Sequence, residues 1–194
     1  MTRAVAGPMV WVVVGFAVAG ALVGVVWAWL APPVHGAIAL TKAGQRVHVY
    51  LGNEADHFFV AAVMMVGLLA AVAVVAAVLV WQWRQRRGPA MVVALTLGGL
   101  AAAGSATGVG ALLASLRYEV ADIAAAPVSP EHRVHYLVEA PSVFFGHTPL
   151  QIVATLLVPA AAATLTYASL VAASAHDDLG VGDGVEVSVP ETAA

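Results

Sequence analysis

Four long stretches of apolar residues constrain this chain more than any other feature. They run from about 9 to 30, 58 to 81, 89 to 116 and 150 to 173, and none of them contains Asp, Glu, Lys or Arg. A stretch of ~20 apolar residues crosses the ~30 Å hydrocarbon core of a bilayer as a helix, which satisfies its own backbone hydrogen bonds. The sequence therefore predicts a mainly α-helical, polytopic membrane protein with four transmembrane helices.

The composition excludes several other classes of protein. Of the 194 residues, 61% are hydrophobic and only 10% are charged, whereas soluble domains average about 25% charged residues. The formal net charge of −3, with eight Lys and Arg, leaves no surface that can neutralise a run of phosphates. Without cysteine there is no disulfide and no thiolate metal site. We therefore expect neither a water-soluble domain nor a nucleic-acid partner.

Basic residues predict the orientation of the chain. Arg84, Arg86 and Arg87 lie in the short link between the second and third stretches, and Arg3 precedes the first. Short loops rich in Lys and Arg remain on the cytoplasmic side. We therefore expect a multi-pass protein of the plasma (inner) membrane with both termini in the cytoplasm.

The remaining segments divide the chain into a membrane domain and a tail. With both termini inside, the loops at 31–57 and 117–149 face outward, and one transmembrane domain covers residues 1–174. Residues 175–194 are acidic, rich in glycine and poor in large apolar groups. Such a composition cannot bury enough apolar surface to fold, so it predicts a disordered cytoplasmic tail.

Local signals mark the ends of the predicted helices. Thr148 offers an N-cap hydroxyl, Pro149 suits the first helical position, and Gln151 can complete a capping box. Trp27 and Trp29 end the first stretch. Amphipathic indole rings favour the membrane–water interface, so we expect both rings there.

The two outward loops resemble each other. Residues 46–51 can be laid on residues 133–137 by skipping Val49, and a Phe-Phe pair follows each block. An ancestral duplication explains this match, and so does chance. Duplication would give two hairpins with the same orientation, a parallel repeat about an axis along the membrane normal. The predicted architecture is then a pseudo-symmetric four-helix bundle.

Part of each outward loop also carries the pattern of a strand. Apolar and polar residues alternate over 46–51, and less regularly over 133–138. Alternation with a period of two is typical of a half-buried strand. Residues 37–40 and the turn at 41–44 can supply a preceding strand. The sequence therefore predicts a small extracytoplasmic β element above the bundle.

Small residues indicate where the helices pack. Gly20 and Gly24 in the first stretch, and Gly104 and Gly108 in the third, form two GxxxG motifs. Lipid is as apolar as a helix surface, so helices in a bilayer associate through close packing over such residues. We predict that both motifs join the first and third helices within one chain. Dimerisation, or contact with another membrane protein, is the alternative use of the same motif.

Residues able to bind or catalyse gather in the outward loops. The candidate binding residues are Arg46, His48, Tyr50, Glu54, His57, Arg133, His135, Tyr136, Glu139 and His147. Imidazole with carboxylate can bind a metal or act as an acid–base pair. Their spacing matches no established ligand motif such as HExxH. We therefore expect histidines bonded to backbone or carboxylate, and assign no metal, cofactor or catalytic residue.

The two loop arginines allow two interpretations. Arg46 and Arg133 either pair with Glu54 and Glu139 to steady the loops, or bind an anionic lipid headgroup by bidentate hydrogen bonds. We expect the pairing with carboxylates.

Four segments carry a resemblance to a known family. They are APPVHG (31–36), LGNEADHFF (51–59), VLVWQWRQRRGP (78–89) and VFFGHTPLQIVATLLVPA (143–160). The chain resembles an actinobacterial, mycobacterial-type family of four-span integral membrane proteins whose domain has no assigned function. The resemblance covers almost the whole chain except its extreme N-terminus and acidic tail. It implies a four-helix membrane fold and lends no catalytic residue.

Three functional hypotheses follow. The first is a non-enzymatic accessory or scaffold subunit whose outward loops bind a membrane lipid, a larger membrane protein complex or a second copy. The second is a metal- or lipid-handling membrane enzyme. It requires at least three members of one set of outward side chains to converge in one cavity: His48, His57, His132, His135, His147, Glu54 and Glu139. The third is a small transporter, which requires a polar path through spans that contain no ionisable residue.

Overall fold

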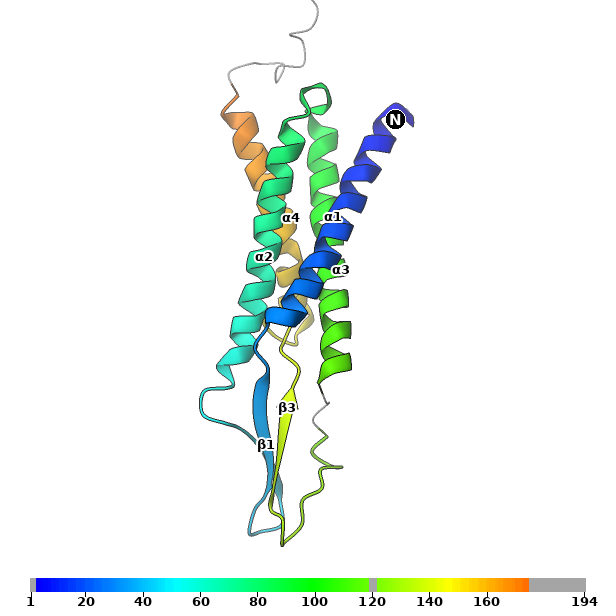
Figure 1. The fold of residues 1–194 in the computed structure, drawn as a ribbon. Helices are drawn as coiled ribbons and strands as arrows, with labels where there is room; N and C mark the ends of the chain where they lie inside the picture. Colours follow the sequence, from blue (N-terminus) through cyan, green and yellow to red (C-terminus); the bar gives the residue numbers. More distant parts are fainter. Residues whose placement is uncertain (1–2, 119–121, 175–194) are drawn as a thin grey trace, which may run out of the picture.

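Four long helices and one small sheet form the structure (Figure 1). The computed structural model describes residues 3–118 and 122–174, so the tail predicted for 175–194 lies outside the described residues. The helices are α1 (Arg3–Leu30), α2 (Asp56–Trp81), α3 (Pro89–Arg117) and α4 (Pro149–Ala172), and the short 3₁₀ helix η1 (Arg84–Arg86) links α2 to α3.

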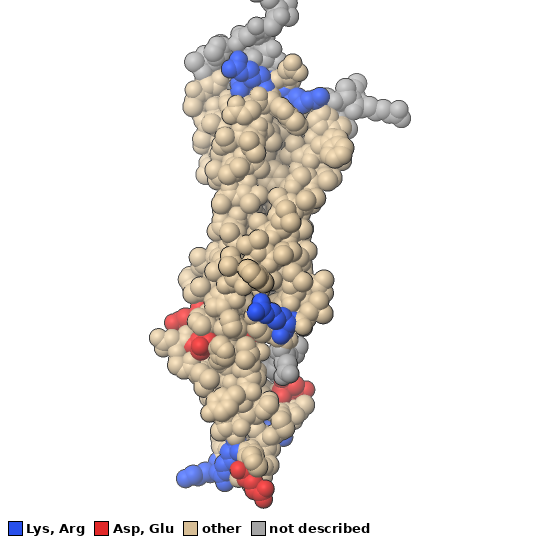
Figure 2. Space-filling model, viewed as in Figure 1, with Lys and Arg blue, Asp and Glu red and all other residues tan. Residues whose placement is uncertain are grey.

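All four helices are long and apolar enough to cross a membrane. The qualifying segments are Gly7–Leu30, Asp56–Trp81, Pro89–Arg117 and Pro149–Ala172. These bounds lie close to those of the predicted stretches, so the mainly helical fold is confirmed. In Figure 2 a wide band of the surface shows no charged side chain, and Lys, Arg, Asp and Glu lie toward its two ends.

A three-stranded antiparallel sheet stands at one end of the helices (Figure 1). Its strands are β1 (Val34–Leu40), β2 (Arg46–Tyr50) and β3 (Val134–Glu139), in the order β2-β1-β3. The predicted β element is therefore present, and it joins both long loops in one sheet. The start of α1, η1 and the end of α4 all lie at the opposite end of the molecule (Figure 1).

The sheet places the two similar loop blocks in matching positions. Ile38 of β1 pairs with His48 on one side and with His135 on the other. Tyr50 and Tyr136 pair with neighbouring residues of β1, so these two side chains lie on opposite faces of the sheet. Residues 122–133 contain no strand that would correspond to β1. The duplication stays a prediction.

Helices α1 and α3 make the most extensive contact in the bundle. A Cβ added at Gly20 would overlap the backbone oxygen of Ala102, and one at Gly24 would lie 2.5 Å from the backbone oxygen of Ala106. The Ser105 hydroxyl crosses the same interface and donates a 2.7 Å hydrogen bond to the carbonyl of Ala17. The first GxxxG motif therefore lets two backbones approach closely, as expected.

The second GxxxG motif does not take part in this contact. A Cβ added at Gly104 or Gly108 would meet nothing within 4 Å, and both residues are exposed. The face of α3 that touches α1 carries Ala102, Ala106 and Gly110 instead. The prediction for the second motif was wrong because residue spacing shows that two residues share one face of a helix but does not show which neighbour that face contacts.

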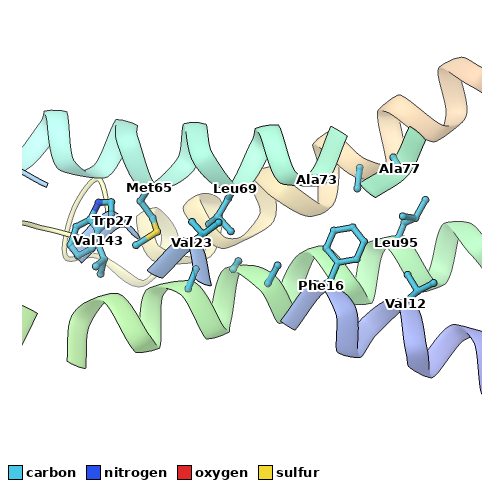
Figure 3. Close-up of a cluster of buried hydrophobic side chains, with 14 of the residues drawn as sticks. Val12, Phe16, Val23, Trp27, Met65, Leu69, Ala73, Ala77, Leu95 and Val143 are labelled. Atoms are coloured by element: carbon cyan, nitrogen blue, oxygen red, sulfur yellow. The ribbon is translucent and has the colours of Figure 1, made fainter. Parts of the chain in front are cut away.

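Trp27 lies in the core and not at an interface. Its side chain is fully buried, and its indole N–H donates a 2.7 Å hydrogen bond to the Ala61 carbonyl of α2. The ring packs against Gly110, where a Cβ would lie 3.0 Å from it, and it lies beside Met65 in Figure 3. Trp29, by contrast, is 80% exposed. Trp27 therefore ties α1 to both α2 and α3.

Helix α4 begins with the predicted capping box. The Thr148 hydroxyl accepts from the backbone N–H of Gln151, and the Gln151 side chain accepts in return from the Thr148 backbone N–H. Further along, Gly99 of α3 sits so close to Ala160 that a Cβ there would lie 2.5 Å from the Ala160 Cα. Helix α3 thus packs against α1 on one side and against α4 on another.

We predict that Gly20→Ala lowers the stability of the purified protein and that Gly104→Ala does not. The added Cβ at position 20 must push α1 and α3 apart, and overpacking of this kind costs ~1–3 kcal/mol. At Gly104 nothing lies within 4 Å, and alanine there gains ~1 kcal/mol of helix propensity. Thermal unfolding in detergent measures both variants. An equal loss at the two sites would contradict the assigned packing face.

Candidate functional site

One face of the sheet, here called the covered face, carries half of the predicted binding residues. Arg46, His48, Tyr50, His135 and Glu139 lie on it, because they pair with alternate residues of β1. The segment after α3 closes over this face. Its Ala126 packs with Ile38 and Leu137, and the Arg46 guanidinium donates to the carbonyls of Ile123 and Ala124.

His48 and Glu139 meet across the central strand. His48 Nε2 lies 2.6 Å from Glu139 Oε1, and the two side chains are 17% and 13% exposed. Gly36 makes this contact available, because a Cβ there would lie 2.9 Å from His48 Nε2 and 3.0 Å from Glu139 Oε1. The two buried atoms touch without the alignment of a hydrogen bond, and no other group in the described residues bonds to them. The pair fills space that Gly36 leaves.

Tyr50 closes one side of this pair. Its ring packs edge-on against His48 at 4.8 Å and against Phe58 at 5.6 Å between centroids. Burial raises the pKa of the Tyr50 phenol, and the negative charge of Glu139 raises it further. Tyr50 therefore keeps its proton and serves as a packing residue between the sheet and α2.

Glu54 organises a second cluster, at the junction of β1 and α2. Its Oε2 accepts from the Nδ1 and the backbone N–H of His35 at 3.1 and 3.2 Å. His57 Nδ1 lies 2.8 Å from the same oxygen and 2.8 Å from the Pro33 carbonyl. The hydrogen bond from His35 is the largest cause that holds the pKa of Glu54 below its ordinary value. The cluster fixes the first turn of α2 to the start of the sheet.

The remaining candidates lie apart from these two clusters. Arg133 is exposed and donates from Nε to the Pro130 carbonyl at 3.1 Å. His147 is exposed just before α4, and Tyr136 lies on the opposite face of the sheet. The expected pairing of Arg46 and Arg133 with Glu54 and Glu139 was wrong. Both carboxylates contact histidines instead, because the sheet register brings imidazoles and not guanidinium groups beside them.

The geometry lacks the convergence that an enzyme site of this type requires. Among residues 3–118 and 122–174, no group of three or more His, Asp or Glu side chains could hold a metal ion. His48 with Glu139, and His35 and His57 with Glu54, form separate clusters. The condition set for the metal- or lipid-handling enzyme is therefore not met in the described part of the chain.

The other face of the sheet, here called the open face, exposes large apolar side chains. Their exposed fractions range from 38% to 68%, and they belong to Val47, Val49, Val134, Tyr136 and Val138. Sequence reasoning named only Tyr136 among them. The alternation along 46–51 and 133–138 predicted the strands but not which set of side chains would be covered.

A pocket of about 390 Å³ lies between the end of α3 and the neighbouring part of β1 and β3, and Gly36 and Leu137 of the covered face are among the residues that line it. Arg117 and Tyr118 line it from the helix, and His35, Leu51, Tyr136 and Val138 line it from the sheet. The Arg117 guanidinium carbon lies 5.6 Å from the centroid of the Tyr118 ring. Sequence reasoning missed this pocket because Arg117 and His35 are far apart in the chain.

The chain is similar to uncharacterized mycobacterial proteins. Residues 16–181 match the family described as a protein of unknown function, DUF2567. The chain belongs to this family. It is 52% identical over 172 residues to an uncharacterized protein of Mycobacterium leprae, covering 89% of this chain and 87% of the relative. It is 50% identical over 175 residues to an uncharacterized protein of Mycobacterium tuberculosis (strain H37Rv), covering 90% and 91%.

The family assignment confirms the resemblance drawn from the sequence. No solved structure matches the fold.

We predict that Gly36→Ala destabilises the sheet by ~1–3 kcal/mol, because the new Cβ collides with the buried His48–Glu139 pair. In the double variant Gly36→Ala/His48→Ala, the methyl group occupies space that the imidazole has vacated. The combined loss should then be smaller than the sum of the two single losses, as a double-mutant cycle of unfolding measurements would show. Strictly additive losses would contradict the contact.

A pH series tests the Glu54 cluster. Because the folded pKa of Glu54 lies below its ordinary value, the ionised group stabilises the fold at neutral pH. That contribution is lost as the pH falls from the ordinary carboxylate range through the lowered pKa. Glu54→Gln should therefore make the unfolding temperature less dependent on pH as the pH falls below the ordinary carboxylate range. The exposed Glu131→Gln is the control and should keep the wild-type slope; a wild-type slope in Glu54→Gln would refute the role.

Proposed function

We propose that this protein is a non-enzymatic, four-span accessory subunit of the plasma membrane whose open face binds the extracytoplasmic part of a larger membrane protein complex. The observation that carries the proposal is the exposure of five large apolar side chains on one sheet face beyond the ends of the helices. A contiguous apolar surface of this kind on a water-facing element marks an interaction site.

The charge distribution supports the membrane placement. The link around η1 carries Arg84, Arg86 and Arg87, and it lies at the end of the molecule where α1 begins (Figure 1). The sheet end carries charges of both signs (Figure 2). With the basic link in the cytoplasm, the sheet faces outward and both termini face the cytosol.

The open face suits an apolar protein surface. Its exposed side chains are four valines and one tyrosine, without Lys, Arg, Asp or Glu among them. Val49 and Tyr136 flank Ala37 of the central strand, which is only 3% exposed, so the exposed apolar surface lies on the two outer strands. A partner that buries these groups gains ~25 cal/mol for each Å² of apolar surface removed from water. Apolar, charge-poor patches are typical of permanent subunit interfaces.

The polar groups within the helices favour this proposal over a transporter. Ser105 bonds to the carbonyl of Ala17 on α1, whereas Thr107 and Thr155 bond to carbonyls of their own helices. Hydroxyls used in this way satisfy their own hydrogen bonds and do not line a polar path.

We predict that a photo-crosslinking amino acid at position 49 gives one defined heteromeric adduct in native membranes, and that the same probe at Gln45 does not. Val49 lies on the open face, whereas Gln45 is exposed at the β1–β2 turn. The adduct should disappear when Val47→Glu and Val134→Glu place two charges on the face. It should persist with the charge-matched control, Gln45→Glu and His132→Glu.

Three outcomes separate the proposal from its alternatives. Loss of the adduct with Val47→Glu and Val134→Glu, but not with the control substitutions, supports the accessory role. An adduct composed solely of two copies of this chain would overturn it in favour of a homo-oligomer. Equal adducts at positions 49 and 45 would mean that the open face is not a specific interface. Val134→Thr, which is closer in shape to valine, shows the same direction of change if the charged variant fails to fold.

A further inference from the structure

The pocket between the sheet and the end of α3 lies where lipid headgroups are found in the proposed membrane placement. Arg117 is the last residue of α3 and the last residue of the apolar segment that qualifies as a membrane span. Lipid phosphates occupy the layer just outside the hydrocarbon core. The pocket therefore opens at the depth of the phosphates and not in bulk water.

Arg117 supplies an uncommitted positive charge to this pocket. Its side chain is exposed, and within the described residues no carboxylate lies within ion-pair distance of it. Its only ring contact there is with Tyr118. A planar guanidinium presents paired N–H donors that match two phosphate oxygens. Arg117 therefore has no carboxylate partner among the described residues that it must release before it binds a phosphate.

Two further side chains give the pocket polar groups on the sheet side. Tyr136 lines the pocket and is 68% exposed, and its hydroxyl makes no hydrogen bond in the described residues. His35 lines it too, and Glu54 occupies only its Nδ1, so the other ring nitrogen remains for a ligand. Glu54 itself does not line the pocket.

The rest of the lining suits the glycerol and upper acyl part of a lipid. Leu51 and Val138 lie beside the polar groups, and both are exposed to solvent, at 40% and 38%. A ligand with a phosphate and an apolar stem satisfies both parts of the lining, whereas a free inorganic phosphate satisfies only the polar part. The pocket volume of about 390 Å³ falls within the ~300–1,000 Å³ of typical small-ligand sites.

We propose that this pocket binds the phosphate group of an anionic glycerophospholipid, held by Arg117 with Tyr136 and His35. The inference rests on the proposed membrane placement, with the sheet beyond the outward end of α3. It does not rest on the docking role of the open face. Tyr136 and Val138 belong to both surfaces, but Val47, Val49 and Val134 do not line the pocket.

Native mass spectrometry of the full chain in detergent tests the site with defined probes. Phosphatidylglycerol should bind at least tenfold more tightly than diacylglycerol, which lacks the phosphate. Arg117→Gln should reduce phosphatidylglycerol binding at least tenfold and leave diacylglycerol binding unchanged. Arg133→Gln is the matched control, since Arg133 is exposed in the same part of the molecule but lies outside the pocket, and it should bind as the wild type does.

Two further measurements identify the source of the phosphate and allow for a variant that fails to fold. Inorganic phosphate should displace phosphatidylglycerol only at far higher concentration; displacement at equal concentration would overturn the lipid assignment in favour of a free anion. Should Arg117→Gln fail to fold, Arg117→Lys and Tyr136→Phe replace it, and each should weaken binding severalfold. Wild-type binding in folded Arg117 variants would refute the site.

The position-49 crosslink separates this inference from the proposed function. Arg117→Gln should leave that crosslink intact, because the valine face is unchanged. Loss of lipid binding with a retained crosslink supports a distinct lipid pocket. Loss of both in the folded variant would show that the pocket is part of the protein interface, and would overturn its assignment as a separate lipid site.

Discussion

The close approach of α1 and α3 over Gly20 and Gly24 is the contact on which the rest of the structure depends. Apolar surface gains little by moving from lipid to a neighbouring helix, so packing of backbones and a few hydrogen bonds must hold the helices together. The approach brings Trp27 against Gly110, and from there its indole N–H reaches the Ala61 carbonyl of α2. One pair of glycines thus fixes three helices, and with them the ends from which the sheet strands leave.

A glycine also permits a close contact in the sheet. Gly36 leaves a gap in the central strand, and His48 and Glu139 fill it from the two outer strands. Burial of this pair has a cost, because neither facing atom is otherwise satisfied. The contact compensates for this cost because it connects separate parts of the fold. The pair joins the hairpin that follows α1 to the strand that precedes α4, and Glu54 adds a link to α2 through His35 and His57.

Periodicity and composition predicted the helices, their ends and the β element because these depend on local sequence. The capping box at Thr148 is local in the same sense. The direction in which each face of a helix points was not predictable. Gly104 belongs to a GxxxG motif with the same spacing as that of Gly20, yet it faces away from α1. Trp27 has the side chain and the sequence position that are typical of the membrane interface. In the structure its indole N–H instead donates to the carbonyl of Ala61, and the ring lies in the core. The pocket combines Arg117 with His35, and only the packing of α3 against the sheet brings them together.

The division of the sheet into two faces changes which residues matter for function. His48, Tyr50 and Glu139 have the side chains that chemistry requires, yet the covered face commits them to each other and to packing. Valines on the open face have no chemistry of their own, but they remain available to a partner. An interaction surface needs exposure more than reactive groups. The residues that make this protein specific are therefore found among those whose identity alone suggests only a core.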